Sequence, residues 1–336
     1  MRNDKNMILQ TNTLSIGYKK SKGKILFIQQ DLNLSVAQGE MVCLIGPNGC
    51  GKSTLIRSIA GLQPYFSGEI YIGGKAISKQ NNQNRALLIG LVLTDRVNAG
   101  NLTVFDIVSI GRQPHTNWFG GLSEADEQRI WEALEQVHLT SYAKRNFNEL
   151  SDGEKQRVMI AKALVQDTSL IILDEPTAHL DLPNRVEIML LLRNLAKQTQ
   201  KAIILSTHEL DLALQVADTI WLMQQNKGVI VGAPEDLILN GSFQQIFANR
   251  AFSFDEFTGN FSLNYSSSSE ISLFGDKKQV YWTARALSRE GYSIVPEASV
   301  SVEAHSDNRW TLRSSERVED FDSVEKLLKS LEPRFS

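Results

Sequence analysis

The stretch with the clearest capacity for chemistry is residues 46–53, which has the P-loop pattern G-x-x-x-x-G-K-S. Glycines in such a loop let the backbone approach a polyphosphate and turn successive N–H groups toward it. The Lys52 ammonium can reach the β- and γ-phosphates of a nucleotide, and the Ser53 hydroxyl can ligate Mg²⁺. We therefore predict a nucleoside triphosphate site. The residues of the loop are Gly46, Pro47, Asn48, Gly49, Cys50, Gly51, Lys52 and Ser53.

The segments on either side of this loop argue against a chance match. At ordinary glycine content the pattern arises by accident in roughly one chain in a hundred of this length. Here the apolar residues 41–45 predict a buried strand before the loop, and residues 54–60 carry apolar side chains at helical spacing after it. A loop between a strand and a helix is what the motif requires. The helix N-terminus adds positive partial charge under the phosphates.

Two carboxylates follow the apolar residues 170–173, which read as a strand. In P-loop proteins the first acid at this place, here Asp174, holds Mg²⁺ directly or through water. The second, Glu175, can polarise a water against the γ-phosphate. The alternative for this pair is an N-cap of the next helix. A second apolar strand, residues 202–207, ends at His208, which is either structural or a γ-phosphate contact.

The pair Ser151 and Glu154, and the aromatic residue Tyr18, can each be interpreted either structurally or functionally. Ser151 followed three residues later by Glu154 is a capping-box pattern, so a helix begins here, and its N-terminus could receive an anion. Standing alone, it would be an ordinary capped helix. Tyr18, at the end of an early strand, is either a half-buried strand-end residue or a ring placed to stack on adenine.

Taken in order, these motifs resemble the ATP-binding subunits of ABC transporters. The matching segments are the A-loop Tyr18, the Walker A loop 46–54, the signature 150–154, Walker B 170–175, the D-loop 178–181 and the switch His208. The resemblance covers about residues 7–245. It implies an α/β fold of the P-loop NTPase class, with a RecA-like core, an antiparallel β subdomain and a helical subdomain near residues 100–165.

The same resemblance implies an ATPase that uses ATP and Mg²⁺ and converts ATP and water to ADP and phosphate. It implies a head-to-tail pair of subunits with two ATPs in the interface. Each ATP would contact Lys52, Ser53, Thr54 and Asp174 of one subunit and Ser151, Gly153 and Glu154 of the other. Glu175 would be the general base, and His208 would position the water and the γ-phosphate, with Lys52 on the phosphates.

The implied partners are a second copy of the chain, membrane permease subunits and, indirectly, a substrate-binding protein. We expect the permease contact near residues 95–118 and a peripheral position on the cytoplasmic face of the inner membrane. Residues 102–115, with the run Ile110-Gly111-Arg112-Gln113-Pro114-His115, resemble the importers of iron–siderophore, haem and vitamin B12 complexes. The rival is a soluble ABC ATPase acting on ribosomes or DNA. Those proteins usually carry two ATPase units or coiled-coil insertions, whereas this chain has one P-loop and no heptad run.

Two residues depart from the family pattern. Thr94, after the predicted strand 86–93, stands where Gln is usual, and Asp152 stands where the signature usually has Gly. Threonine can still offer an oxygen, so Thr94 is a candidate Mg²⁺ ligand beside Ser53 and Asp174. Asp152 would lie near a γ-phosphate unless it points away. The departures motivate a further alternative, a module that binds nucleotide with little hydrolysis. Because the P-loop lysine, both acids and the switch histidine are retained, we predict hydrolysis.

Composition excludes several other classes. The 336 residues are 42% hydrophobic with a net charge of −3, which gives no electrostatic case for nucleic acid. The two cysteines, Cys43 and Cys50, suggest no disulfide framework and fit a reducing compartment. The first residues show no signal peptide, and we expect no membrane-spanning segment.

The residues after about 250 predict a separate, small α+β unit. The expected strands are residues 271–274, 299–304 and 309–313, and the expected helices are 277–289 and 323–331. From 251 to 336 the chain has ten Lys or Arg and fourteen Asp or Glu, an acidic balance that also argues against nucleic-acid binding. Two roles stay open, a packing extension and a regulatory ligand-sensing domain.

Overall fold

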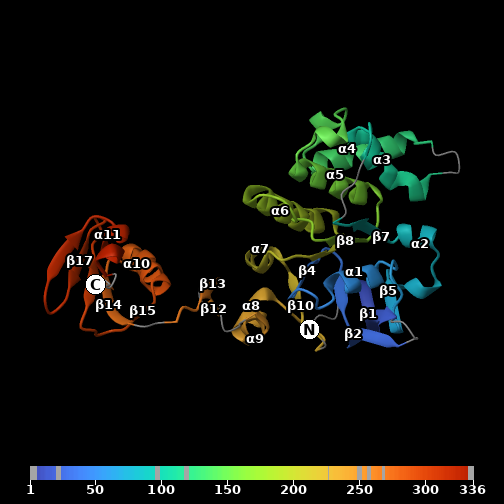
Figure 1. Ribbon diagram of the computed structural model, residues 1–336. Helices are drawn as coiled ribbons and strands as arrows, with labels where there is room; N and C mark the ends of the chain where they lie inside the picture. The colour runs from blue at the N-terminus through green and yellow to red at the C-terminus, as the bar shows by residue number, and fades with distance from the viewer. Residues whose placement is uncertain are drawn as a thin grey trace. The chain divides into compact units, whose positions relative to one another are not determined.

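The computed structural model describes residues 6–19, 24–94, 99–116, 121–225, 227–247, 252–255, 259–266 and 269–331. The chain divides into two compact units, one made chiefly of residues up to Phe247 and the other chiefly of residues from Phe261 (Figure 1). Among the described residues, no helix combines the length and the apolar character needed to cross a bilayer.

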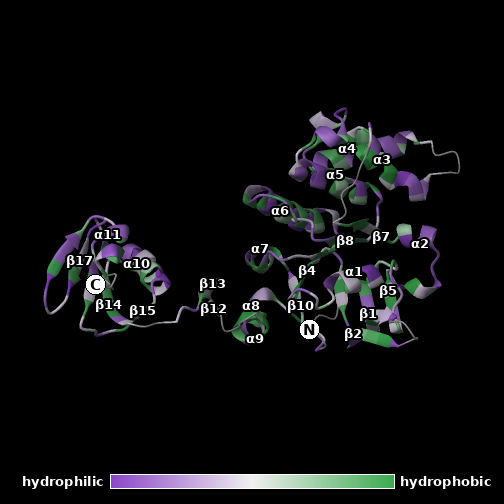
Figure 2. Cartoon of the chain, in the orientation of Figure 1, coloured by the Kyte–Doolittle hydropathy of each residue, from purple (hydrophilic) through white to green (hydrophobic). Residues whose placement is uncertain are grey.

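A six-stranded sheet forms the centre of the first unit, in the order β11-β10-β4-β9-β8-β7. All neighbours are parallel except the edge strand β11, which runs antiparallel to β10. The strands are β4 (Met41–Ile45), β7 (Ile89–Val92), β8 (Leu170–Asp174), β9 (Ala202–Ser206), β10 (Thr219–Met223) and β11 (Val229–Gly232). Every residue of β4, β8, β9 and β10 is buried, which is why these strands read as continuous apolar runs without alternation (Figure 2).

Helices pack against this sheet and connect its strands. Helix α1 contacts β8 and β9 and also β1 of a second sheet, while α6 and α7 contact β4. These helices are α1 (Lys52–Ile59), α6 (Leu182–Thr199) and α7 (Leu210–Val216), and α8 (Pro234–Leu239) packs on α7 and on α9 (Ser242–Phe247). Because these strands run parallel, their carboxyl ends lie along one edge of the sheet, and the loops that follow the strands lie there too.

The second sheet of this unit is antiparallel, with the path β2-β1-β5-β6 and β3 also paired to β1. Its strands are β1 (Met7–Lys19), β2 (Ile25–Leu32), β3 (Ser35–Ala37), β5 (Ser67–Ile72) and β6 (Lys75–Ala76), followed by η2 (Ile77–Lys79) and α2 (Asn82–Ala86). Leu9, Ile16 and Val36 of this sheet share one apolar cluster with Leu44 and Leu55 of the core. The predicted α/β fold with an antiparallel subdomain is confirmed.

The predicted strand at residues 86–93 is wrong at its start. Helix α2 continues through Ala86, and the strand β7 begins only at Ile89. The Asn81 side chain caps this helix by accepting the Asn84 N–H at 2.8 Å. The apolar run hid the boundary, because an apolar stretch looks the same at a helix end and in a buried strand.

A set of helices is inserted between β7 and β8. They are α3 (Val104–Ser109), η3 (Ile110–His115), α4 (Glu124–Gln136), η4 (Thr140–Tyr142), η5 (Phe147–Glu149) and α5 (Asp152–Val165). Three of them begin with complete capping boxes, Thr103 with Asp106, Ser123 with Asp126, and Ser151 with Glu154. The helix start predicted at Ser151 is confirmed.

The run at residues 110–115 is a packing element of these helices. Gly111 lies so close to α5 that a Cβ atom would come within 2.2 Å of the Lys162 carbonyl oxygen. Arg112 is buried, pairs with Asp126 at 2.7 Å and donates to the Val165 carbonyl at 2.9 Å. His115 contacts the Gln166 carbonyl at 2.8 Å. Residues 110–115 therefore pack η3 against the C-terminal end of α5 and against α4.

The second unit is a small mixed α+β domain. Its sheet has the order β15-β14-β16-β17-β18, parallel around β14 and antiparallel from β16 to β18. The elements are β14 (Ser269–Gly275), α10 (Lys277–Arg289), β15 (Tyr292–Ile294), β16 (Ser301–Ala304), β17 (Trp310–Arg313), β18 (Val318–Phe321) and α11 (Val324–Leu331). Ile271, Leu287, Val302, Leu312 and Leu327 belong to its core. The predicted extension is confirmed as to class, and β15 and β18 were not predicted. A separate two-stranded sheet pairs β12 (Phe252–Asp255) with β13 (Asn260–Leu263).

The buried pair of Arg112 and Asp126 gives a prediction about stability. Hydrogen bonds from Ser123, followed by the guanidinium of Arg112, lower the pKa of Asp126 to about 2. Arg112→Leu would leave this carboxylate buried without its cation and should destabilise the protein by about 3–5 kcal/mol. Urea unfolding at pH 7 measures the loss. Arg129→Leu is the control, because Arg129 and Asp167 form a half-exposed pair worth about 0.2–1 kcal/mol. Equal losses of unfolding free energy in the two variants would contradict the greater importance of the buried Arg112–Asp126 pair.

The same carboxyl gives a pH dependence. Because the folded-state pKa of Asp126 lies below its unfolded value, the stabilisation is complete above about pH 4 and is lost as the pH falls toward 2. Urea unfolding of wild type and Asp126→Asn between pH 6 and pH 2.5 should show two curves that converge as the pH falls. Parallel curves would contradict the lowered pKa.

Candidate functional site

The P-loop lies between β4 and α1, and a Cβ atom at Gly46 or at Gly51 would come within 2.3 Å of a neighbouring atom. Helix α1 begins at Lys52, with Gly51 as its N-cap in the left-handed region at φ 109°. A Cβ atom on Gly51 would lie 2.3 Å from the Ile28 side chain on β2. Gly51 thus lets the antiparallel sheet close over the loop while the first N–H groups of α1 stay free of a side-chain cap.

Lys52 is buried at the start of α1. Its ammonium donates to the carbonyl oxygens of Gly46, at 2.8 Å, and Pro47, at 3.4 Å. Burial lowers the pKa of Lys52 below its usual range, and the nearby acids Glu175 and Asp174 oppose this shift. The Lys52 ammonium therefore binds carbonyl oxygens of its own loop. A polyphosphate in the loop would bring negative charge, which stabilises a buried cation.

The two acids lie where β8 ends. Asp174 is buried, and its Oδ1 atom is 3.3 Å from the Ser53 hydroxyl, so two of the three predicted metal ligands lie close together beside the loop. Glu175 follows with φ 51°, a left-handed conformation that few non-glycine residues adopt. Its carboxylate contacts His208 Nε2 at 2.8 Å. The structure thus brings the acid pair and the histidine together beside the P-loop.

A hollow of about 450 Å³ opens over the loop. Its lining comprises Tyr18, Ile28, Asn48, Gly49, Gly51, Lys52, Ser53, Thr54, Glu175 and His208. The Tyr18 ring is 47% exposed, and its hydroxyl is 2.5 Å from the Thr54 hydroxyl. An aromatic ring at one end and an ammonium at the other suit a ligand with a flat base and a charged tail.

Both departures from the family pattern line a second, smaller hollow of about 180 Å³. Thr94, Asp152, Lys155 and His179 all contribute to its wall. The Thr94 hydroxyl donates to the backbone carbonyl of Asp174 at 2.8 Å, so its proton is engaged while its oxygen lone pairs keep capacity for a further contact. Asp152 lies in the first turn of α5 and is exposed.

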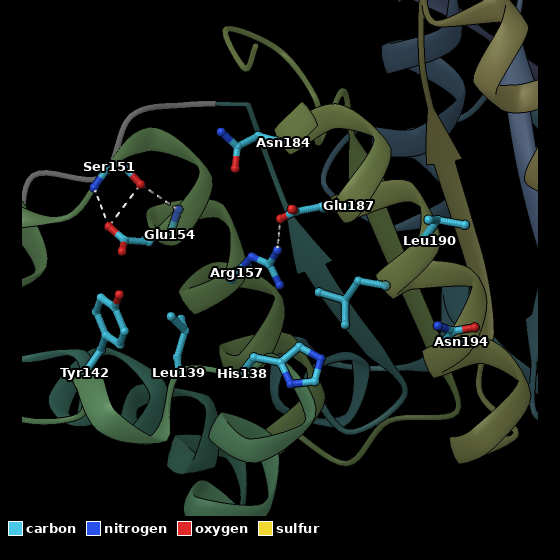
Figure 3. Close-up of a pocket in the computed structure, with 11 residues that line it drawn as sticks. His138, Leu139, Tyr142, Ser151, Glu154, Arg157, Asn184, Glu187, Leu190 and Asn194 are labelled. Carbon is cyan, nitrogen blue, oxygen red and sulfur yellow. Dashed lines mark hydrogen bonds and ion pairs between the residues drawn. The ribbon is translucent and has the colours of Figure 1, made fainter. Parts of the chain in front are cut away.

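Two signature residues, Ser151 and Glu154, line a third hollow, of about 600 Å³ (Figure 3). Hydrogen bonds from Ser151 lower the pKa of Glu154. Gly153 packs on α6, where a Cβ atom would come within 2.5 Å of Asn184 Oδ1. Arg157 of α5 reaches Glu187 of α6 at 2.5 Å across the hollow. All residues that line this hollow lie outside the P-loop, so the signature and the P-loop occupy separate places in one chain.

Two residues that support the site escaped prediction from the sequence. Gln29 on β2 is buried, donates to the Cys50 carbonyl at 3.4 Å and to the Gln224 carbonyl, and accepts the Gly228 N–H at 2.8 Å. Ser206, at the end of β9, contacts both acids. The available signal for Ser206 was a polar residue near the end of the predicted strand 202–207.

Family comparisons match both units. Residues 29–178 match the family described as ABC transporter, and residues 268–332 match the one described as iron ABC transporter C-terminal domain. The second match gives the C-terminal unit a family that its sequence pattern alone did not reveal.

Two relatives cover most of the first unit. An uncharacterised ABC transporter ATP-binding protein of Methanocaldococcus jannaschii is 40% identical over 256 residues, which is 76% of this chain and 87% of that protein. The iron(3+)-hydroxamate import ATP-binding protein FhuC of Bacillus subtilis is 36% identical over 241 residues, 71% of this chain and 87% of FhuC.

Two solved structures share the fold. One is an inward-facing transporter assigned to the metal-chelate type, with a TM-score of 0.61 and 29% identity over 72% of this chain and 89% of that one. The other is an ATP-binding cassette solved as a dimer with ADP and phosphate, with a TM-score of 0.58 and 27% identity over 67% of this chain and 98% of that one.

The two readings of Tyr18 can be separated by two substitutions. If the ring stacks on adenine, Tyr18→Ala should weaken ATP binding about 5- to 100-fold, because stacking of a base on an aromatic ring contributes about 1–3 kcal/mol. Tyr18→Phe should stay within about threefold of wild type, since it loses only the contact with Thr54. Titration with a fluorescent ATP analogue measures both, and thermal unfolding checks the fold. Unchanged ATP binding by Tyr18→Ala would contradict stacking on adenine and favour the interpretation of Tyr18 as a half-buried residue at the end of a strand.

Proposed function

This chain belongs to the ATP-binding proteins of ABC transporters, and we propose that the hollow over its P-loop binds and hydrolyses MgATP to power uptake of an iron chelate through a membrane permease. ATP hydrolysis coupled to transport is the activity of this family. The single observation that carries the proposal to this chain's own residues is the meeting of the P-loop, the acid pair and His208 around one hollow.

The donor set fits Mg²⁺. This cation takes oxygen ligands, usually one or two from the protein, with waters and substrate phosphates completing the shell. The Ser53 hydroxyl and the Asp174 carboxylate, 3.3 Å apart, offer such a pair. The Thr94 oxygen is a third candidate near the same acid. When bound, the metal would neutralise charge on the β- and γ-phosphates. Lys52 would add its ammonium to the same oxygens.

Glu175 is placed to act as general base. Its carboxylate lines the hollow, and the contact with His208 holds it at the side of the P-loop. A water between Glu175 and the terminal phosphate would lose a proton to the carboxylate as its oxygen bonds to the γ-phosphorus and the bond from that phosphorus to the departing ADP breaks. His208 would orient that water and the γ-phosphate, because its ring lies within hydrogen-bond reach of the base.

We propose that the complete site forms between two copies. Ser151 and Glu154 line a hollow apart from the P-loop within one chain, Gly153 lies between them in the first turn of α5, and a similar cassette has been solved as a dimer. In a head-to-tail pair the N-terminus of α5 in one copy would face the phosphates bound by the other. The dimer would sit on permease subunits at the cytoplasmic face of the inner membrane, with a substrate-binding protein as the indirect partner.

An iron chelate, a siderophore complex or haem, is the favoured cargo class, ahead of vitamin B12, which is a cobalt complex. The match of residues 268–332 and the similarity to FhuC both favour iron complexes. The predicted permease contact near residues 95–118 stays a proposal; residues 95–98 and 117–120 lie outside the described part of the chain.

The second candidate is a nucleotide-binding subunit with little hydrolysis. Thr94 and Asp152, the two departures from the family pattern, line one hollow next to Asp174 and motivate this alternative. Measured turnover decides between the two.

Hydrolysis is tested with the purified chain, alone and with its permease in lipid. Wild type should hydrolyse ATP only with Mg²⁺. Glu175→Gln should bind ATP normally while turnover falls at least about 100-fold, since a general base contributes about 10²–10⁴-fold. Lys52→Ala should lose both binding and turnover. Wild type that binds ATP yet stays inactive with the permease would favour the second candidate, and an active Glu175→Gln would remove Glu175 from the base role.

The head-to-tail arrangement is tested by mixing two inactive variants. Lys52→Ala removes the ammonium that binds the phosphates in the P-loop. Gly153→Asp places a carboxylate in the signature, where it would repel the phosphates. A mixed dimer contains one site with an intact P-loop and an intact signature. The mixture should therefore show more ATPase activity than the sum of the separate variants. A mixture no more active than that sum, in variants that remain folded and dimeric, would count against a shared site.

A further inference from the structure

Ser206 ends the strand β9, and its side chain is completely buried. β9 lies between the P-loop strand β4 and the acid-bearing strand β8. The register places Ser206 beside Leu44 on one side and beside Asp174 on the other. Two parallel ladders of backbone hydrogen bonds therefore fix its position, and a buried hydroxyl there needs hydrogen-bond partners.

One oxygen atom of Ser206 contacts both acidic residues. The hydroxyl donates to Asp174 Oδ1 at 2.6 Å and accepts the Glu175 backbone N–H at 2.9 Å. A hydroxyl has a single proton, and here it goes to a carboxylate, which makes the stronger, charge-assisted kind of bond. The same atom therefore sets the rotation of the first acid and the backbone position of the second.

The neighbouring residues extend this control. Glu175 has φ 51°, so the direction in which its side chain leaves the backbone is unusual and depends on what holds the peptide in place. The Thr207 N–H bonds to the Leu44 carbonyl at 3.2 Å, which ties the segment after Ser206 to the P-loop strand. His208 then meets the Glu175 carboxylate. Both ends of Glu175, its N–H and its carboxylate, are thus held from residues 206–208.

We propose that Ser206 is a positioning residue of the ATPase reaction. Its hydroxyl holds the Asp174 carboxylate in the orientation that serves the metal, and it holds the Glu175 peptide so that the base points into the hollow. Ser206 acts through these two acids rather than on the nucleotide. The proposal deepens the proposed function and rests on it. A purely structural role, filling a polar gap between buried strands, is the competing explanation.

Ser206→Ala removes the hydroxyl and tests the proposal in the full-length chain. We expect kcat to fall about 10- to 100-fold, the scale of a misplacement near 1 Å at a reacting group. KM for ATP should stay within about threefold, and the Mg²⁺ concentration for half-maximal activity should rise. Ser206→Thr keeps the hydroxyl and should recover most of kcat.

Ser58→Ala is the matched control. Ser58 is also completely buried, lies on α1, and its hydroxyl has no hydrogen-bond partner among the described residues. It should turn over ATP as wild type does. If Ser206→Ala unfolds, Ser206→Cys replaces it, because the thiol keeps the volume and donates only weakly; kcat should fall at least about fivefold.

The proposal is overturned if Ser206→Ala, or Ser206→Cys in its place, keeps the wild-type kcat and Mg²⁺ dependence. It is also overturned if Ser206→Ala and Ser58→Ala lose activity equally in step with thermal stability, since that pattern belongs to a structural role. Inactive wild type that still binds ATP would count against the proposed function itself, and only an active wild type bears on Ser206.

Discussion

The register of three neighbouring parallel strands is the constraint on which the site depends. β4, β9 and β8 end at one edge of the sheet, with Leu44, Ser206 and Asp174 in line across them. The P-loop, the proposed general base and the switch histidine all lie on segments that follow directly from these strand ends. The P-loop follows β4, Glu175 follows β8 and His208 follows β9. A slip of one residue in any of these pairs would turn a buried apolar side chain toward the hollow and the functional one away.

Local sequence patterns made part of the fold and of the candidate site predictable. The strand, loop and helix around Lys52, and the capping box at Ser151, are each written within a few consecutive residues. The placement of Asp174 at the end of an apolar run likewise needed no knowledge of its neighbours. The class of fold followed from these elements and their order, which is why the resemblance to ABC transporter ATPases held for the first unit.

What the sequence did not disclose depends on contacts between distant residues. Nothing near Thr94 indicates that its hydroxyl meets a carbonyl eighty positions later. Nothing near Arg112 shows that it is buried against Asp126, so the run around it served as a family marker whose physical role is packing. The start of β7 was missed because apolar composition continues across the end of α2. Strand β15 is only three residues long, too short for a clear periodicity, and two of the four residues of β18 are acids, which are uncommon in strands.

The separation of the signature from the P-loop has a consequence for how the protein behaves at different concentrations. A site completed by a second copy is subject to mass action, so the free chain at low concentration would hold two halves of a site apart. Two copies fixed to one permease would instead meet at the effective concentration set by their attachment, which for short connections is in the millimolar range. The membrane partner would then act as a tether that keeps the catalytic halves within reach, in addition to receiving the work of hydrolysis.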